Sequence, residues 1–337
     1  MQEERILLLQ LKRIGDAILT APAFSLVRQT FPNARLTLAL SGATAQLGPA
    51  FCDVDELLHY RPGKPNVKIW SRLITGRFDK CLDFSGSDRA ALMARLSGAT
   101  DRMGYRKFAE GKRGRQAAYT ALCDASVRDL HTVDFHLALA QMITGTGSRP
   151  QSSGFTLPGS SQAVAAVTAA AGERYAVVHP GTARTEKYWP AERWAQVIAH
   201  LQQTHQLPCV LTGSLNDAEE AAHLQEIQLL TGSPLQNLAG QLSLIDVAAV
   251  IGGSAIALGV DSAAMHLAAM LEIPQIVLFG PTNPFHWRPR HEDATVLLAG
   301  DASPNVQTFQ TKHNPAPMAD LSTQHVCHAI DARLGAS

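Results

Sequence analysis

The sequence predicts an α/β protein with two domains in tandem, each built on a parallel sheet. The chain has 337 residues, about twice the length of a typical single domain. Short apolar runs alternate with helical segments of about 10–15 residues, which is the pattern of βαβ units. A Gly-, Ser- and Pro-rich stretch at 145–161 interrupts this alternation. We therefore predict domains at 1–155 and 156–337, with a cleft between the carboxyl ends of the two sets of strands.

The predicted elements of the first half alternate in order. Strands, the last with its turn, are expected at 5–11 (RILLLQL), 35–40 (RLTLAL) and 79–86 (DKCLDFSG). Helices are expected at 17–31, 89–98 and 131–145, the first ending before Pro32 and the others at glycines.

The second half has the same alternation with longer apolar runs. Strands, three of them with their turns, are expected at 175–181 (YAVVHPG), 208–214 (PCVLTGS), 255–260 (AIALGV) and 274–280 (PQIVLFG). Helices are expected at 191–205, 216–230, 242–253 and 262–272. A last helix is predicted at about 320–335, and one option is that it packs back on the first domain.

The charge is distributed unevenly between the two halves. Residues 1–150 hold 21 Lys and Arg against 14 Asp and Glu, whereas residues 151–337 hold 8 against 15. Six of the basic residues fall between Arg102 and Arg115. This run is either a solvated basic face or a surface for an anionic partner, such as a phosphorylated ligand or a membrane. Nucleic acid is disfavoured because no binding motif or aromatic interleaving accompanies the run.

The remaining composition indicates a globular protein of a reducing compartment. Five scattered cysteines form no CxxC pair, which favours reduced thiols over disulfides or a zinc site. The first residues, MQEERILLLQLKR, are expected to form a strand rather than a signal peptide. No apolar run reaches the ~18–20 residues of a membrane span.

Several common catalytic motifs are missing from the sequence. We find no Walker A sequence, no GxGxxG after a strand, no GxSxG and no HExxH. The pair Asp53 and Asp55 resembles the metal-holding acidic pair of some sugar transferases, but it lacks the expected strand context. A metal there is disfavoured.

Two segments of the second half have the composition of anion sites. In HPGTARTEKYWP (179–190), a turn after a strand brings glycine, threonine hydroxyls and Lys187 before a helix. In GVDSAAMHLAA (259–269), a buried strand leads directly into a helix whose N-terminus suits a diphosphate. Alternatives stay open: Asp261 could be only the helix cap, and His266 only a core histidine.

Two further strand ends are predicted to converge on the same edge. LTGSLND places Asp217 near a helix start, where its carboxylate could accept hydrogen bonds from a ribose or simply cap the helix. FGPTNP closes the next strand with a rigid turn.

In the first half, Asp16 of KRIGDAIL lies where a strand turns into a helix, and it is either a cap or a catalytic base.

Three of these segments together resemble one family. IGDAILTAPA, HPGTARTEKYWPAERW and GVDSAAMHLAAMLEIPQIVLFGPTNP are similar to segments of the heptosyltransferases, the family-9 glycosyltransferases of lipopolysaccharide core assembly. The resemblance implies a GT-B fold, with two Rossmann-like domains around a cleft. It implies an inverting transfer of heptose from ADP-L-glycero-D-manno-heptose to a lipid-linked, phosphorylated acceptor, without a metal or cofactor. The enzyme would be cytoplasmic, with peripheral contact to the inner face of the inner membrane.

The resemblance also assigns roles to individual residues. Asp16 matches the general base, and we expect Lys12 and Arg13 to keep it ionised. The expected donor-binding residues are Thr182, Lys187, Asp217, Asp261, Ser262, Ala263 and His266. The basic residues considered for acceptor phosphates are Arg13, Arg61, Lys64 and Arg106.

The sequence departs from the family pattern at three donor positions. Ala183 replaces the second threonine of a pair, Ser262 stands where threonine is common, and Asp217 stands for a ribose-binding acid that is often Glu. The donor and subgroup therefore stay open. The alternatives are another nucleotide-sugar or glycan acceptor, a binding protein that no longer transfers, or an epimerase on the same fold.

Overall fold

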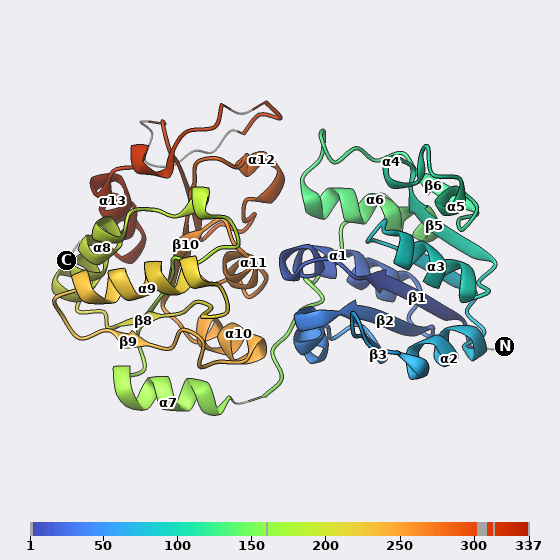
Figure 1. Ribbon diagram of the computed structural model, residues 1–337, viewed down its shortest axis with the longest axis horizontal. Coiled ribbons are helices and arrows are strands. Elements are labelled where there is room, and N and C mark those ends of the chain that lie inside the picture. The colour runs from blue at the N-terminus through green and yellow to red at the C-terminus, as the bar shows by residue number, and fades with distance from the viewer. Residues whose placement is uncertain (1–2, 160, 302–308, 313, 336–337) are drawn as a thin grey trace. The chain divides into compact units, whose positions relative to one another are not determined.

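The chain forms two compact units, Met1–Pro158 and Gly159–Ser337. The computed structural model describes residues 3–159, 161–301, 309–312 and 314–335 (Figure 1). The boundary between the units falls inside the Gly-, Ser- and Pro-rich stretch at 145–161. Each unit is an open parallel sheet covered by helices on both faces, so the predicted α/β class is confirmed.

The first unit contains a six-stranded sheet in the order β3-β2-β1-β4-β5-β6, and every neighbouring pair is parallel. The strands are β1 (Arg5–Gln10), β2 (Arg35–Ser41), β3 (Glu56–Tyr60), β4 (Lys80–Asp83), β5 (Asp101–Tyr105) and β6 (Ala121–Cys123). This is the doubly wound order of the Rossmann fold. The winding direction reverses between β1 and β4, and ligands bind at such a switch point.

The second unit repeats the same topology with the order β12-β11-β10-β7-β8-β9, again with parallel neighbours. Its strands are β7 (Ala176–His179), β8 (Cys209–Leu211), β9 (Gln236–Asn237), β10 (Ile256–Val260), β11 (Gln275–Phe279) and β12 (Ala294–Leu298). The switch point of this sheet lies between β7 and β10.

Helices cover both faces of the first sheet. On one face α1 (Ile14–Thr30) packs against α6 (Thr132–Thr144), and on the other α2 (Val67–Thr75) packs against α3 (Asp88–Leu96). The central strand is apolar on both sides, because residues 6–9 are all leucine or isoleucine and fully buried. The short elements are η1 (Gly42–Ala50), α4 (Arg106–Ala109) and α5 (Arg113–Gln116).

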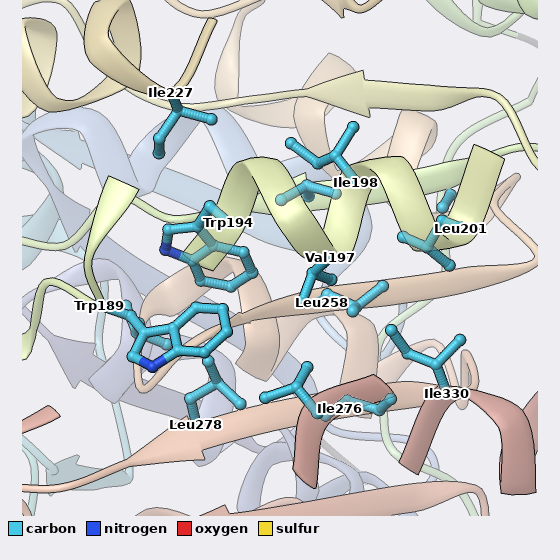
Figure 2. Close-up of a cluster of buried hydrophobic side chains, with 14 of the residues drawn as sticks. Trp189, Trp194, Val197, Ile198, Leu201, Ile227, Leu258, Ile276, Leu278 and Ile330 are labelled. Atoms are coloured by element: carbon cyan, nitrogen blue, oxygen red, sulfur yellow. The ribbon is translucent and has the colours of Figure 1, made fainter. Parts of the chain in front are cut away.

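The second sheet is covered in the same way. The helices α8 (Ala191–Thr204), α9 (Ala218–Leu230) and α13 (Thr323–Leu334) lie on one face, and α7 (Gln162–Ala171), α10 (Leu244–Gly252) and α11 (Ala263–Met270) on the other. The short elements are η2 (Thr185–Lys187), α12 (Pro284–Trp287) and η3 (Met318–Asp320). Figure 2 shows Trp189 and Trp194 in the core beneath α8, with ring centroids 5.0 Å apart at 87°.

The last helix packs within the second unit. Helix α13 packs against α8, and its Val326, Ala329 and Ile330 belong to the core of that unit. Its packing against the first domain, one option from the sequence, stays a prediction. The apolar side of α13 is therefore used within its own unit.

Further expectations concern the start of helix α1, the acidic pair, the cysteines and membrane-spanning helices. Helix α1 begins three residues earlier than predicted, so Asp16 lies inside it. In the acidic pair, the Asp55 carboxylate is already engaged, because it forms an ion pair with Arg28 and accepts the N–H of Leu36 at 2.7 Å. All five cysteines are free thiols. Within the described ranges, no helix combines the length and apolar character that a bilayer span requires.

Candidate active site

Asp16 lies in the first turn of α1, directly after β1 at the switch point of the first sheet. The N-cap residue is Arg13, so Asp16 is not the cap that the sequence left open. Burial raises the pKa of the Asp16 carboxyl, and the charges of Lys12 and Arg13 and the N–H of Arg13 oppose this effect. The two basic neighbours act in the expected direction, but burial is the stronger influence. A carboxyl with a raised pKa is suited to accepting a proton near neutral pH.

A second carboxyl, Asp83, lies at the end of β4, next to β1 in the sheet. Burial raises its pKa, although its carboxylate accepts hydrogen bonds from the Tyr119 hydroxyl at 2.6 Å and from the N–H groups of Ser85 and Gly86 at 2.8 and 3.0 Å. The charge of Lys12 acts on both Asp16 and Asp83. The sequence analysis missed Asp83, because only the sheet order brings the end of β4 beside β1.

Lys12 is itself half-buried between these carboxyls and an aromatic ring. Burial lowers the pKa of its ammonium group, and the two aspartates act against that effect. Its Nζ lies 4.5 Å from the centroid of the Phe108 ring, within the range of a cation–π contact. The switch point of the first unit is thus a small, partly desolvated group of charges.

The predicted acceptor residues are spread along the carboxyl edge of the first sheet. Arg13 is exposed at the start of α1, and Arg61 and Lys64 are exposed in the loop after β3. Arg106 follows β5 and forms an ion pair with Asp124. Because β3 and β5 are four strand spacings apart, these groups are separated by about 19 Å at the sheet. They share one edge but do not form one compact cluster.

The end of the basic run, with Arg95 of α3, lines a separate hollow. A cavity of about 560 Å³ lies between α3 and α5, and its basic lining residues are Arg95, Lys112, Arg113 and Arg115. Arg115 is held by an ion pair with Asp88. The other three side chains belong to exposed residues.

In the second unit, the anion-type segments meet at the switch point between β7 and β10. The ammonium Nζ of Lys187 donates to the Asp261 carboxylate at 2.6 Å and to the Asp261 carbonyl at 3.1 Å. Thr282, in the turn after β11, donates to the same carboxylate at 2.8 Å. The side chains of Lys187 and Asp261 are only 12% and 7% exposed. Since an ammonium has three N–H donors, one donor of Lys187 remains for a ligand.

The start of α11 adds unpaired donors next to this ion pair. Ser262 is the N-cap residue but makes no side-chain cap, and within the described part of the chain its buried hydroxyl has no partner. Asp261 is therefore not the cap, and Ala263 is the first helical residue. His266 is buried one turn later. Burial lowers its pKa and Lys187 adds to this, while Asp261 opposes it, so the imidazole is neutral at neutral pH.

The turn after β7 contains Thr182 and lies against an acid that the sequence analysis missed. A Cβ atom at Gly181 would lie 1.9 Å from the Glu220 carboxylate, so this close approach requires glycine. Glu220 is buried, which raises its pKa, and it accepts the N–H of Ser214 at 2.8 Å. Asp217 instead caps α9 by accepting the N–H groups of Glu219 and Glu220, each at 3.0 Å. Its predicted contact with a ribose stays a prediction.

The two units therefore offer complementary chemistry, each at its own switch point. One presents a carboxylate that can act as a base, and the other presents an ammonium group, a free hydroxyl and helix N–H groups that can hold an anion. This combination fits one class, the transferases of the GT-B fold, which move a sugar from a phosphorylated donor.

Sequence comparison identifies the family. The sequence profile of glycosyltransferase family 9 (heptosyltransferase) matches residues 66–315, and the chain belongs to this family. It is 24% identical to lipopolysaccharide heptosyltransferase 3 of Escherichia coli, over 96% of this chain and 97% of that protein. It is 25% identical to lipopolysaccharide heptosyltransferase 1 of Salmonella typhimurium, over 83% of this chain and 89% of that protein.

Solved structures share the fold over the full length. A family-9 glycosyltransferase from Veillonella parvula superposes with a TM-score of 0.82 at 21% identity, covering 100% of this chain and 99% of that one. The Escherichia coli heptosyltransferase WaaC, solved with ADP, has a TM-score of 0.77 at 20% identity, covering 98% and 99%. The predicted family, GT-B fold and glycosyltransferase activity are confirmed.

Proposed function

We propose that the chain transfers heptose from ADP-L-glycero-D-manno-heptose to an inner-core acceptor of lipopolysaccharide, with inversion at the anomeric carbon. The observation that carries this proposal is the match to lipopolysaccharide heptosyltransferases over almost the whole chain. Both halves are covered, so the proposal includes the acceptor side as well as the donor side.

The second unit would bind the donor through its diphosphate. Phosphate oxygens accept hydrogen bonds from donors of the kind found here: the remaining N–H of Lys187, the unpaired hydroxyl of Ser262 and the free N–H groups in the first turn of α11. Thr182 would add a hydroxyl from the turn after β7, and Asp217 a ribose contact. A family relative solved with ADP supports this choice of nucleotide.

Asp16 would act as the general base of the transfer. As the acceptor oxygen forms its bond to C1 of the heptose, its proton passes to the Asp16 carboxylate and the bond from C1 to the diphosphate oxygen breaks. The leaving ADP gains negative charge, which Lys187 and the N-terminus of α11 would stabilise. His266, neutral and buried one turn into α11, would line the same pocket. No resident metal or cofactor takes part in the proposed step.

The first unit would bind an anionic glycolipid. Its charge balance of +7, with Arg13, Arg61, Lys64 and Arg106 along the carboxyl edge, favours phosphorylated lipid A and core sugars. The basic cavity between α3 and α5 adds Arg95, Lys112 and Arg113. We propose a cytoplasmic enzyme that contacts the inner membrane peripherally, with binding that weakens as salt increases.

The central test is the variant Asp16→Asn, assayed with ADP-heptose and an inner-core acceptor that the unaltered chain glycosylates. We expect turnover to fall by at least about 100-fold, since a positioned base contributes about that much or more. Affinity for ADP should be unchanged, because the donor site belongs to the other unit. Glu192→Gln is the matched control: it also removes a carboxylate from the first turn of a helix, but an exposed one. Near-normal turnover of Asp16→Asn would disprove the base assignment.

A different donor is the second candidate, favoured by Ala183, where some family members have a second threonine, and by Ser262, where threonine is common. A screen of ADP-heptose against other ADP-, UDP- and GDP-sugars distinguishes the two. Turnover of another sugar at a higher rate would replace the proposed donor. Tight nucleotide-sugar binding without transfer to any core acceptor would instead indicate a binding protein.

A further inference from the structure

Two histidines and one aspartate meet at the far end of the second unit from the donor site. His200 lies near the end of α8, His205 is the residue that ends it, and Asp331 lies on α13. One carboxylate oxygen of Asp331 is 2.7 Å from Nε2 of His200 and 2.7 Å from Nε2 of His205. The three potential ligand atoms all lie within 4.8 Å of one another.

One of the three side chains is buried, and the other two are partly exposed to solvent. The His205 side chain is 3% exposed, whereas His200 and Asp331 are 21% and 34% exposed. An ion could therefore enter from solvent, and a water molecule could complete its coordination. The transfer reaction proposed above uses none of these three residues.

We propose that His200, His205 and Asp331 bind one divalent transition-metal ion, with Zn²⁺ the best match. Two imidazole nitrogens and one carboxylate oxygen are typical zinc ligands, and they bind at about 2.0–2.2 Å. Ligand atoms around a tetrahedral ion at that distance are about 3.3 Å apart. The present 2.7 Å separations from Asp331 thus need to lengthen by about 0.6 Å, and the two imidazole nitrogens, within 4.8 Å of each other, need to approach by at most about 1.5 Å.

Nδ1 of His200, the ring nitrogen that would not bind the metal, already has a hydrogen-bond partner. An imidazole that binds a metal through Nε2 carries its proton on Nδ1, which then needs an acceptor. The hydroxyl of Thr204 lies 3.3 Å from Nδ1 of His200 and can accept a hydrogen bond from that N–H group. Metal binding would replace the two hydrogen bonds to Asp331 without leaving His200 Nδ1 unpaired.

The bound ion would connect two helices and would not touch the transferred sugar. Helix α8 begins at Ala191, four residues after Lys187, and its 14 residues extend about 21 Å toward His205. The ion would fasten the end of α8 to α13. Its role would be structural, holding the helix whose start follows the donor loop.

The test is a titration of the full chain, prepared without a histidine tag and stripped with a chelator, with Zn²⁺ at pH 7.5. We expect one ion per chain and a rise in melting temperature of about 5–10 °C when free Zn²⁺ is 100-fold above its Kd. Substituting Co²⁺ should produce the visible absorption of a four-coordinate site.

Two variants and one control decide the outcome. His200→Gln and Asp331→Asn keep polar side chains at partly exposed positions, and each should weaken Zn²⁺ binding at least tenfold and abolish the Co²⁺ absorption. Folding without metal is checked by circular dichroism. The control His59→Asn removes an exposed histidine of the first unit and should leave binding unchanged. No binding by the unaltered chain at 100-micromolar Zn²⁺, or undiminished binding by both folded variants, would overturn the proposal.

Discussion

The ion pair between Lys187 and Asp261 makes a specific prediction about stability. Replacing Lys187 with methionine keeps the length of the side chain but removes its charge. Asp261 would then be left as a buried carboxylate, 7% exposed, that still accepts a hydrogen bond from the Thr282 hydroxyl at 2.8 Å. A buried charge without its partner is strongly destabilising.

The size of the effect follows from the burial of the pair. Breaking a buried ion pair by removing one partner costs about 3–5 kcal/mol, and the retained Thr282 bond places Lys187→Met near the lower end, at about 3 kcal/mol. For a unit of this size that corresponds to a melting temperature lower by about 6–12 °C. The double variant Lys187→Met with Asp261→Asn removes both charges, so it should recover most of the loss.

Thermal unfolding of the second unit, followed by calorimetry, measures both variants. Arg184→Met is the control, because it breaks an ion pair with Glu186 in the same loop whose two side chains are about half exposed. No measurable change is expected there. If Lys187→Met melts within 2 °C of the unaltered chain, or if the double variant is no more stable than the single one, the pair is not a buried, mutually dependent unit. The same double variant should bind ADP weakly despite its restored stability.

Three further predictions concern single side chains. Because burial raises the pKa of Asp16, its ionised form is disfavoured in the folded state, so Asp16→Asn should melt higher than the unaltered chain at pH 8. The difference should shrink as pH falls below that raised pKa and vanish below the ordinary pKa that the carboxyl has in the unfolded chain, and a constant difference across pH would refute this. Asp217→Ala should cost about 1 kcal/mol in urea unfolding by removing the cap of α9, while Asp217→Asn should not. Trp194→Ala should cost about 3–5 kcal/mol by opening a cavity in the core, against little change for Leu229→Ala, whose side chain is 77% exposed.

Much of the fold could be predicted because a strand that is buried on both faces is a continuous apolar run in the sequence. The strands β1, β10 and β11 are continuous apolar runs, and the structure places them within two residues of the expected bounds. Shorter or more polar strands escaped prediction: β3 reads as ELLHY, and β9 has only two residues. Helix α7 was also missed, because its alanine-rich sequence directly follows a Gly- and Ser-rich stretch.

The site residues divide in the same way. Asp16, Lys187 and Asp261 could be found because each lies in a motif that spans a strand end and a helix start. The carboxyls of Asp83 and Glu220 could not be found from the sequence. Asp83 contacts Tyr119, and Glu220 lies against Gly181, so each partner is far along the chain.

The sequence by itself determined the class of fold, the family and the strand ends at which chemistry is possible, since these depend on local patterns of burial and turn residues. Only the tertiary structure decided which charges share a partner: Lys187 with Asp261, and His200 and His205 with Asp331. It also decided that burial outweighs two basic neighbours at Asp16. The physical reason is that desolvation and ion pairing depend on what surrounds a group in space, and those surroundings come from parallel strands and helices that are distant in sequence.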